Sequence, residues 1–243
     1  MGISKRQIDK LGERLKKGFH TSSDLEVLDE YTASHKTAFE YIVFRIRDVM
    51  GLEPTGRRVK STASIVAKLQ RESVRLSQIQ DIAGCRIVVE DIYWQNTMVD
   101  YLTEHLGYAG VAFSLTDRRE KPSNGYRAVH IIATWMGRNV EIQLRTKLQH
   151  LWAEISEKLS DYDPEIKYGA GNHKTRTLLD KTSQLVEEVE MAAKKIFSST
   201  RTREMAGNLT KEDRKEITDI HKMVENAHTL ISDGFTRIIA EIM

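Results

Sequence analysis

The segment from Lys121 to Thr146 constrains the fold most, because it reads as a turn, a strand, a second turn and a second strand. The Pro, Asn and Gly at positions 122–125 favour a turn, since Pro fixes φ and the other two tolerate positive φ. Positions 126–135 are rich in β-branched and aromatic residues, as a strand would be. The segment therefore predicts an antiparallel β-hairpin with one buried and one solvated face. The second strand alternates strictly, with Val140, Ile142 and Leu144 on one face and Glu141, Gln143 and Arg145 on the other.

Helical patterns surround this hairpin. Apolar residues three and four positions apart predict helices over 23–50, 61–72, 92–106 and 146–159, and further strands are expected over 84–90 and 109–116. The box Ser23–Glu26 is expected to cap the first of these helices, and Gly107 is expected to stop the third. This order predicts an α+β fold in which a mixed sheet of about five strands is flanked by helices.

Both ends of the chain are also expected to be helical. A short basic amphipathic helix ends at Gly18, and its basic face fits either solvent or the surface of a nucleic acid or membrane. After about residue 171 two long amphipathic helices follow, the second capped by Thr210 and Asp213, and they pack either on the sheet or on another subunit. We therefore expect an N-terminal helical extension over 1–40, a catalytic domain over 41–170 and C-terminal helices over 171–243.

The composition excludes several classes of protein. The 37 basic and 35 acidic residues leave a net charge of +2, so bulk charge does not make this a polyanion-coating protein. The single cysteine, Cys85, excludes an internal disulfide framework, and its apolar neighbours predict a buried structural thiol. No stretch approaches the ~18 apolar residues of a membrane span, and no signal region opens the chain, so we expect a cytoplasmic protein with no membrane partner.

Several familiar catalytic motifs are missing from the sequence: G-x-x-x-x-G-K-[ST], G-x-S-x-G, H-E-x-x-H and the His-Asp dipeptide of metal-dependent phosphohydrolases. What remains is a layout of polar and charged residues that suits polyphosphates. Cations neutralise phosphates, two carboxylates can hold Mg²⁺, and an aromatic ring can stack on a base. The residues in question are Arg57, Arg58, Lys60, Ser64, Lys68 and Arg71, then Asp81 and Arg86, then Lys121, Tyr126, His130, Glu141, Gln143 and Arg145.

Four of these segments carry a resemblance to a known family. They read G-R-R-V-K-S-T-A-S-I-V-A-K from Gly56, Q-D-I-A-G-C-R from Gln80, N-G-Y-R-A-V-H from Asn124 and V-E-I-Q-L-R-T from Val140. In order and spacing they resemble the synthetase domain of RelA/SpoT-type alarmone synthetases, which are GTP pyrophosphokinases, over about residues 41–168. The resemblance implies a nucleotidyltransferase-like synthetase fold. The missing His-Asp motif and the short length look like a small synthetase without a hydrolase domain.

The resemblance also implies roles for individual residues. Members of this family transfer the β,γ-pyrophosphate of ATP to the ribose 3′-hydroxyl of GDP or GTP and release AMP. By this resemblance, Asp81 and Glu141 are the catalytic carboxylates that hold Mg²⁺, and Glu141 is a candidate to activate the attacking hydroxyl. The implied ATP-binding residues are Arg58, Lys60, Ser64, Lys68 and Arg86. The implied acceptor-binding residues are Tyr126, which stacks on guanine, with Lys121, His130 and Gln143.

Several alternatives stay open at this stage. The spacing before Lys60 leaves Arg57 as the alternative to Arg58. Toxin-type relatives pyrophosphorylate the 3′ end of tRNA and others use adenosine nucleotides, and the basic residues at 118–121 suit an RNA backbone as well as GDP phosphates. A catalytically silent RNA-binding regulator is a third alternative, which the pair of carboxylates disfavours. Small synthetases of this family are often tetramers joined through terminal helices, so a homo-oligomer is also expected.

Overall fold

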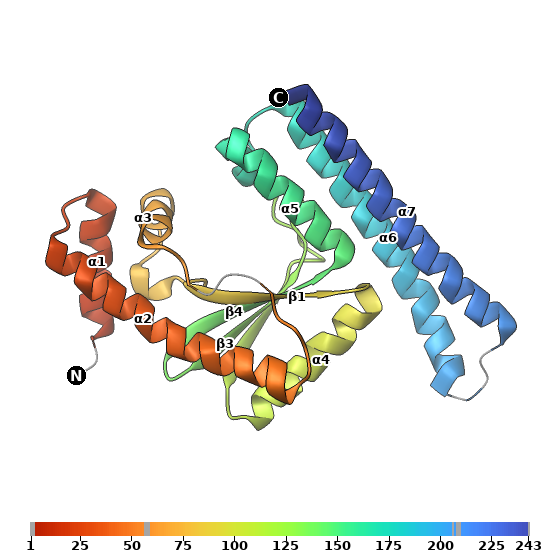
Figure 1. Ribbon diagram of the computed structural model, residues 1–243, viewed down its shortest axis with the longest axis horizontal. Coiled ribbons are helices and arrows are strands. Elements are labelled where there is room, and N and C mark those ends of the chain that lie inside the picture. The colour runs from red at the N-terminus through yellow and green to blue at the C-terminus, as the bar shows by residue number, and fades with distance from the viewer. Residues whose placement is uncertain (1–2, 56–58, 206, 208–209, 243) are drawn as a thin grey trace. The chain divides into compact units, whose positions relative to one another are not determined.

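The structure, a computed structural model, describes residues 3–55, 59–205, 207 and 210–242 (Figure 1). Its α-helices are α1 (Lys5–Lys17), α2 (Ser22–Phe44), α3 (Thr62–Arg71), α4 (Ile92–Tyr108), α5 (Lys147–Tyr162), α6 (His173–Met205) and α7 (Lys211–Ile242). A π-helix, η1 (Arg45–Val49), continues α2, and two short 3₁₀ segments are η2 (Leu76–Gln78) and η3 (Pro164–Tyr168). The strands are β1 (Ala83–Val89), β2 (Ala112–Asp117), β3 (Val129–Trp135) and β4 (Arg138–Thr146).

The four strands form one mixed sheet in the order β1-β4-β3-β2. The predicted hairpin is confirmed as β3 and β4, which turn at Met136 and Gly137 with φ values of 49° and 72°. Two consecutive residues with positive φ match the twist of the flanking strands, which is why a glycine stands in this turn. Strand β3 begins at Val129, so residues 126–128 of the segment predicted to be a strand lie before it. The α+β fold expected from the pattern is confirmed.

The predicted number of about five strands is wrong among the described residues, where the sheet has four. Beyond β1 the chain makes isolated antiparallel bridges instead of a strand, and these pair Thr55 with Arg86 and Val59 with Ala83. The backbone N–H of Thr55 donates to Arg86 O over 2.7 Å, and Arg86 N–H donates back over 2.6 Å. Pro54, next to the first bridge, has no N–H to donate to a ladder, so a regular strand cannot continue through it.

Two helix boundaries differ from the prediction. Helix α2 is capped by Thr21, whose hydroxyl accepts from the N–H of Asp24 while the Asp24 carboxylate accepts from the N–H of Thr21. The capping box therefore begins two residues before the one expected at Ser23. Helix α4 runs past Gly107, and the chain reverses at Gly110, which has a φ of 67°. A glycine ends a helix where it takes the left-handed conformation, and Gly110 does so.

Two compact units make up the chain. The first comprises Met1–Ile87, Leu102–Thr116 and His130–Gln143, and the second comprises Val88–Tyr101, Asp117–Val129 and Leu144–Met243. The division into 1–40, 41–170 and 171–243 that the sequence suggests stays a prediction, as does assembly through the terminal helices. Within the described part of the chain, no helix is both long enough and apolar enough to cross a bilayer.

In the first unit, helix α1 packs against α3 and η2. Its apolar stripe Ile8, Leu11 and Leu15 lies in one buried cluster with Ile65 and Leu69 of α3. The basic helix predicted at the N-terminus is thus confirmed, including its left-handed cap at Gly18. Its buried face supports α3, the helix that carries Ser64 and Lys68.

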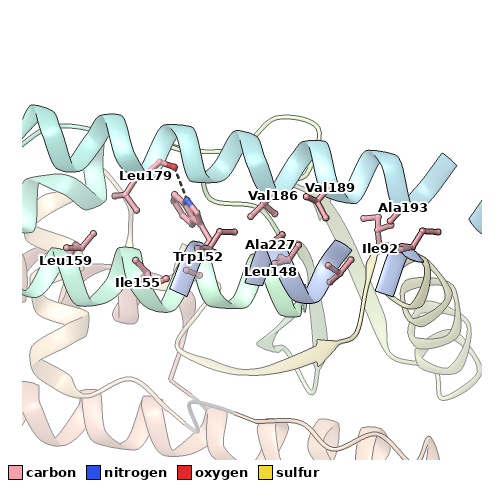
Figure 2. Close-up of a cluster of buried hydrophobic side chains, with 14 of the residues drawn as sticks. Ile92, Leu148, Trp152, Ile155, Leu159, Leu179, Val186, Val189, Ala193 and Ala227 are labelled. Carbon is pink, nitrogen blue, oxygen red and sulfur yellow. Dashed lines mark hydrogen bonds between the residues drawn. The ribbon is translucent and has the colours of Figure 1, made fainter. Parts of the chain in front are cut away.

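In the second unit, α5, α6 and α7 pack together, and α6 and α7 run side by side (Figure 1). Figure 2 shows the apolar cluster that they enclose, with Trp152 of α5 at its centre. The indole N–H of Trp152 donates to the carbonyl oxygen of Leu179 over 2.9 Å, so the one polar atom of this buried ring is satisfied. Trp152 is therefore a core residue.

Candidate active site

A carboxylate bound by two lysines lies in the first unit. Asp81 Oδ2 is 2.9 Å from Lys60 Nζ, and Asp81 Oδ1 is 2.9 Å from Lys68 Nζ. All three side chains are mostly buried, with exposed fractions between 19% and 24%. Paired charges in such a setting are screened little by solvent. The structure therefore brings together three of the residues predicted to bind ATP and metal.

Backbone geometry explains how these side chains meet. The N–H of Lys60 donates to the carbonyl oxygen of Ile82 over 2.7 Å, which fixes Lys60 beside the start of β1. Ser61 then caps α3, accepting from the N–H of Ser64 over 3.3 Å. Lys68 follows Ser64 by four residues on α3, so both project from the same face of that helix. The exposed Ser64 thus lies at the helix N-terminus, where backbone N–H groups favour anions.

Two opposing effects set the charge state of Asp81. Burial raises the pKa of its carboxyl group, and the hydrogen bonds and positive charges of Lys60 and Lys68 lower it more, so the pKa lies below its ordinary value. The group is therefore ionised at neutral pH. The two ammonium groups are suited to bind phosphate oxygens, and the ionised carboxylate between them is suited to bind a divalent cation.

A second carboxylate, Glu141, lies in the middle of β4. Its Oε1 is 2.8 Å from His130 Nδ1 on the neighbouring strand β3, and its Oε2 accepts from Gln143 Nε2 over 2.8 Å. The predicted alternation places these groups: Val140 and Ile142 are fully buried, while Glu141 and Gln143 face the other side and are partly exposed. The hairpin thus brings together three predicted residues, one as a carboxylate and two as its partners.

The pKa of the Glu141 carboxyl group depends on its burial, on its two hydrogen-bond partners and on the charge of Asp81. Burial raises the pKa of Glu141, the hydrogen bond and charge of His130 and the hydrogen bond of Gln143 lower it, and the negative charge of Asp81 raises it again. The net pKa lies below the ordinary value, so Glu141 is also ionised at neutral pH. A charge acts on a pKa only at short range in a protein, so the two predicted metal carboxylates lie in one electrostatic neighbourhood.

The residues fit a magnesium ion as ligands of the right chemistry. No group of three or more His, Cys, Asp and Glu side chains arranged to hold a metal ion occurs among the described residues. Two ionised carboxylates suit Mg²⁺, which keeps several waters and usually shares itself with substrate phosphates instead of sitting in an all-protein cage. The chemistry of Asp81 and Glu141 therefore fits a metal ion that would arrive with a nucleotide.

Cys85 lies on β1 and is buried, as predicted. Burial and the nearby charge of Glu141 raise the pKa of its thiol to about 12. A thiol that stays protonated at neutral pH is a poor nucleophile. Cys85 is therefore a buried core residue, as its apolar neighbours predicted.

Tyr126 belongs to the second unit, where it is partly buried. The guanidinium of Arg145 lies over its ring, 5.0 Å from the ring centroid, and Arg145 Nη2 donates to the Tyr126 hydroxyl over 3.0 Å. These two contacts fix the ring at both its face and its edge. Arg145 is 2% exposed, although the alternation of β4 predicted that it would share the partly exposed face of Glu141 and Gln143.

The remaining predicted residues divide into three groups. Lys121 is exposed in the turn before Tyr126. Arg86 is half-buried on β1, where its backbone pairs with Thr55. Arg57 and Arg58, the two alternatives for the arginine that stacks on adenine, lie outside the described residues.

Comparison with known proteins shows which family part of the chain is similar to. Residues 57–165 match the model of the family described as the region found in RelA / SpoT proteins. This match agrees with the four motifs, and the resemblance to RelA/SpoT proteins predicted from them is confirmed.

Individual relatives agree with this class. The chain is 40% identical over 114 residues to the uncharacterized protein Rv1366 of Mycobacterium tuberculosis. The aligned region covers 46% of this chain and 41% of that protein. The chain is 33% identical over 121 residues to the GTP pyrophosphokinase YjbM of Bacillus subtilis, covering 42% of this chain and 54% of that protein. The chain thus spans about half the length of these relatives.

A solved structure shares the fold. The small alarmone synthetase 1 of Bacillus subtilis superposes with a TM-score of 0.59 at 22% identity, over 72% of this chain and 98% of that one. The protein is thus similar in fold to small alarmone synthetases.

One buried polar residue beside Tyr126 has no role predicted from the sequence. Arg127 follows it directly in the motif N-G-Y-R-A-V-H and is 7% exposed, with partners on α6. The arginine itself indicates this contact in the sequence. An arginine inside an otherwise apolar run is rarely buried unless a carboxylate pairs with it. Its partners stand about 60 positions away, and no periodicity links them to it.

Proposed function

We propose that this protein is a magnesium-dependent pyrophosphokinase. It transfers the β,γ-pyrophosphate of ATP to the ribose 3′-hydroxyl of GDP or GTP, makes (p)ppGpp and releases AMP. One bond forms between the 3′-oxygen and the β-phosphorus, and the bond between the α-phosphate oxygen and the β-phosphorus breaks. The hydroxyl proton leaves to solvent or to a carboxylate.

The observation that carries this proposal is the arrangement of Asp81 and Glu141. Two ionised carboxylates in one electrostatic neighbourhood, the first of them bound to Lys60 and Lys68, form a site with both cations for phosphates and anions for a metal. Among the relatives, YjbM is named a GTP pyrophosphokinase, and the small alarmone synthetase 1 of B. subtilis was solved with its product pppGpp and with AMPCPP. These ligands belong to the nucleotide classes that the proposal assigns to this chain.

On the donor side, Lys60 and Lys68 bind and orient the phosphates of ATP. Ser64 adds a hydroxyl at the N-terminus of α3, where the helix dipole favours negative charge. Arg86, together with Arg58 or its alternative Arg57, stacks on adenine. Fixed positive groups around the β- and γ-phosphates stabilise the charge that develops on the transferring group.

The carboxylates act at the reacting centre. Asp81 and Glu141 would hold Mg²⁺, which when bound neutralises phosphate charge and polarises the phosphoryl oxygens. Glu141, held by His130 and Gln143, also accepts a hydrogen bond from the attacking hydroxyl and orients it. Its lowered pKa makes it a weak base, so orientation and charge contribute more than proton abstraction.

On the acceptor side, Tyr126 stacks on guanine, and Lys121, His130 and Gln143 bind near the acceptor's sugar and phosphates. Stacking fixes the 3′-hydroxyl in line with the β-phosphorus, which turns a bimolecular step into an effectively unimolecular one. The exposed Lys121 gives the phosphates of the acceptor a positive group that solvent and ligands can reach.

One experiment tests the proposal. The protein is incubated with Mg²⁺ and [γ-³²P]ATP in separate reactions with GDP, GTP, ADP and bulk tRNA, and both AMP release and label transfer are followed. The proposal predicts AMP release coupled to labelling of GDP or GTP. Label that enters tRNA or ADP alone would show a toxin-type or adenosine-nucleotide enzyme. No AMP release with any of the four acceptors would leave a catalytically silent binding protein. Either result would overturn the proposal.

A further inference from the structure

The turn that carries Tyr126 is held from both sides by helix α6. Ser183 Oγ donates to the carbonyl oxygen of Gly125 over 2.7 Å, immediately before Tyr126. Immediately after it, Arg127 donates from Nη2 to Glu187 Oε2 over 2.5 Å and from Nε to Ser183 Oγ over 3.3 Å. Ser183 and Glu187 are four residues apart, so they lie on the same face of α6.

Gly125 makes this contact possible. Its φ is 83°, and a Cβ atom there would lie 2.7 Å from Trp152 Cζ2 and 3.2 Å from Ser183 Cβ. Any side chain at position 125 would therefore clash with α5 and with α6. Trp152 is fixed in turn by its hydrogen bond to Leu179 and by the apolar cluster around it (Figure 2). The turn therefore packs directly against Trp152 of α5 and Ser183 of α6.

Arg127 is the second anchor. It is 7% exposed, and its Nη1 donates to the carbonyl oxygen of Arg119 while Nη2 binds Glu187. Arg119 is itself paired with Asp117, with Nη2 2.6 Å from Oδ2. Removing the carboxylate partner of a buried guanidinium destabilises a protein far more than removing the partner of an exposed guanidinium. Glu187 thus fixes the backbone just after Tyr126, as Ser183 fixes it just before.

We propose that Ser183 and Glu187 are positioning residues for the acceptor: they hold the Tyr126 turn so that its ring can stack on the acceptor base. This inference rests on the proposed function. It extends the acceptor site beyond residues 57–165, the part that matches the RelA/SpoT region, into the C-terminal helices. Those helices then set acceptor affinity, in addition to any part they take in packing.

The chain offers matched controls for both residues. Glu188 and Gln184 are the next residues along α6, and both side chains are exposed. Glu187→Gln is therefore compared with Glu188→Gln, and Ser183→Ala with Gln184→Ala. For each variant the thermal unfolding midpoint, kcat, the KM for ATP and the KM for GDP are measured. Equilibrium binding of the fluorescent probe mant-GDP gives a second readout that needs no turnover.

We expect Glu187→Gln to raise the KM for GDP and the Kd for mant-GDP about 10-fold or more, because a small misplacement of a positioning group is costly. The KM for ATP should change less than about 2-fold, since Lys60 and Lys68 belong to the other unit and keep their partners. Ser183→Ala should give a smaller shift in the same direction. Glu187→Asp should recover part of the loss by keeping the charge.

A second arm separates positioning from stability. In a protein that already carries Tyr126→Ala, Glu187→Gln should have no further effect on the KM for GDP, because the group it positions is gone. Equal effects of Glu187→Gln in both backgrounds, or a Glu187→Gln protein that matches Glu188→Gln in GDP and mant-GDP binding, would overturn the inference. Should Glu187→Gln lower the unfolding midpoint by many degrees, Ser183→Ala and Glu187→Asp decide the question.

The failure of this inference differs from failure of the proposed function. If the unaltered protein binds no mant-GDP and releases no AMP with GDP or GTP, the proposed function fails and the inference fails with it. If the unaltered protein does both and Glu187→Gln behaves as its control does, only the inference fails.

Discussion

Gly84 on β1 lies directly against Glu141 on β4: a Cβ atom at position 84 would come within 2.8 Å of the Glu141 carbonyl oxygen and 3.4 Å of its Cβ. Neighbouring strands approach this closely only where one of them has no side chain. The glycine of the segment Q-D-I-A-G-C-R thus permits the approach of β1 to β4 at the residue that holds His130 and Gln143.

This relationship predicts a pair of opposite effects. Gly84→Ala forces a methyl group into backbone, so it should destabilise the protein by about 1–3 kcal/mol and lower pyrophosphate transfer by displacing Glu141. Gly107→Ala is the matched control, because it lies within α4 with nothing near its Cβ position, and it should stabilise by about 0.5–1 kcal/mol. Urea unfolding and AMP release check both. Unchanged stability and activity in Gly84→Ala would contradict the close packing.

The charge on Asp81 predicts how stability depends on pH. Its folded pKa lies below the ordinary value of 3.8, so the stability it contributes is present above that value and is lost as pH falls through the folded pKa. The unaltered protein should therefore lose stability on acidification from pH 5 to pH 3, and Asp81→Asn should lose less over the same range. At pH 7, Asp81→Asn should be less stable by about 1–3 kcal/mol, since Lys60 and Lys68 lose their carboxylate. Urea unfolding across pH 3–7 measures this, and parallel curves for the two proteins would refute it.

Glu190 predicts the opposite slope. Burial raises the pKa of this side chain from 4.5 to about 7, although Thr146 and Gln149 donate hydrogen bonds to it. Because the folded pKa is raised, the unfolded chain ionises first, and stability falls as pH rises from about 4.5 to 7 before it levels off. Glu190→Gln imitates the neutral acid, so it should be more stable than the unaltered protein at pH 8 by up to a few kcal/mol, at about 1.4 kcal/mol per pKa unit. The difference in stability between the two proteins should vanish near pH 4.5. Thermal unfolding of both proteins at pH 4.5, 6 and 8 measures it. A difference of the same size at all three pH values would contradict the prediction.

Lys68 predicts a defect confined to the donor. If its ammonium group binds ATP phosphates, Lys68→Gln should raise the KM for ATP about 10-fold or more while the KM for GDP changes little. Lys36→Gln serves as the control, because Lys36 is 63% exposed on α2 and pairs only loosely with Glu40 at 3.8 Å. Initial-rate measurements with each substrate varied in turn provide the comparison. Equal increases in both KM values would remove Lys68 from the donor site.

Much of this arrangement can be predicted from local sequence. The alternation from Val140 to Leu144 correctly separates the buried face from the face of Glu141 and Gln143, because strand periodicity depends on local geometry alone. The helix predicted over 61–72 likewise matches α3, because its apolar residues recur at helical spacing.

Other features depend on contacts that no local pattern encodes. Arg145 continues the polar face of β4 in sequence, yet it is buried over Tyr126, because the strand ends there and α5 begins. Arg127 meets Ser183 and Glu187 across more than 50 residues of chain. The sheet stops at four strands among the described residues because the segment at Thr55 makes only isolated bridges, and residue-by-residue β propensity does not distinguish a bridge from a strand.

The measurement that bears most directly on the two carboxylates is AMP release by Glu141→Gln in saturating ATP, GDP and Mg²⁺. Glu40→Gln, a charge-neutralising change at an exposed position of α2, is the control. The arrangement of Asp81, Glu141 and His130 predicts that Glu141→Gln loses about 10²–10⁴-fold in kcat with little change in its thermal midpoint, while Glu40→Gln keeps full activity. A Glu141→Gln protein that releases AMP at the unaltered rate would contradict the account.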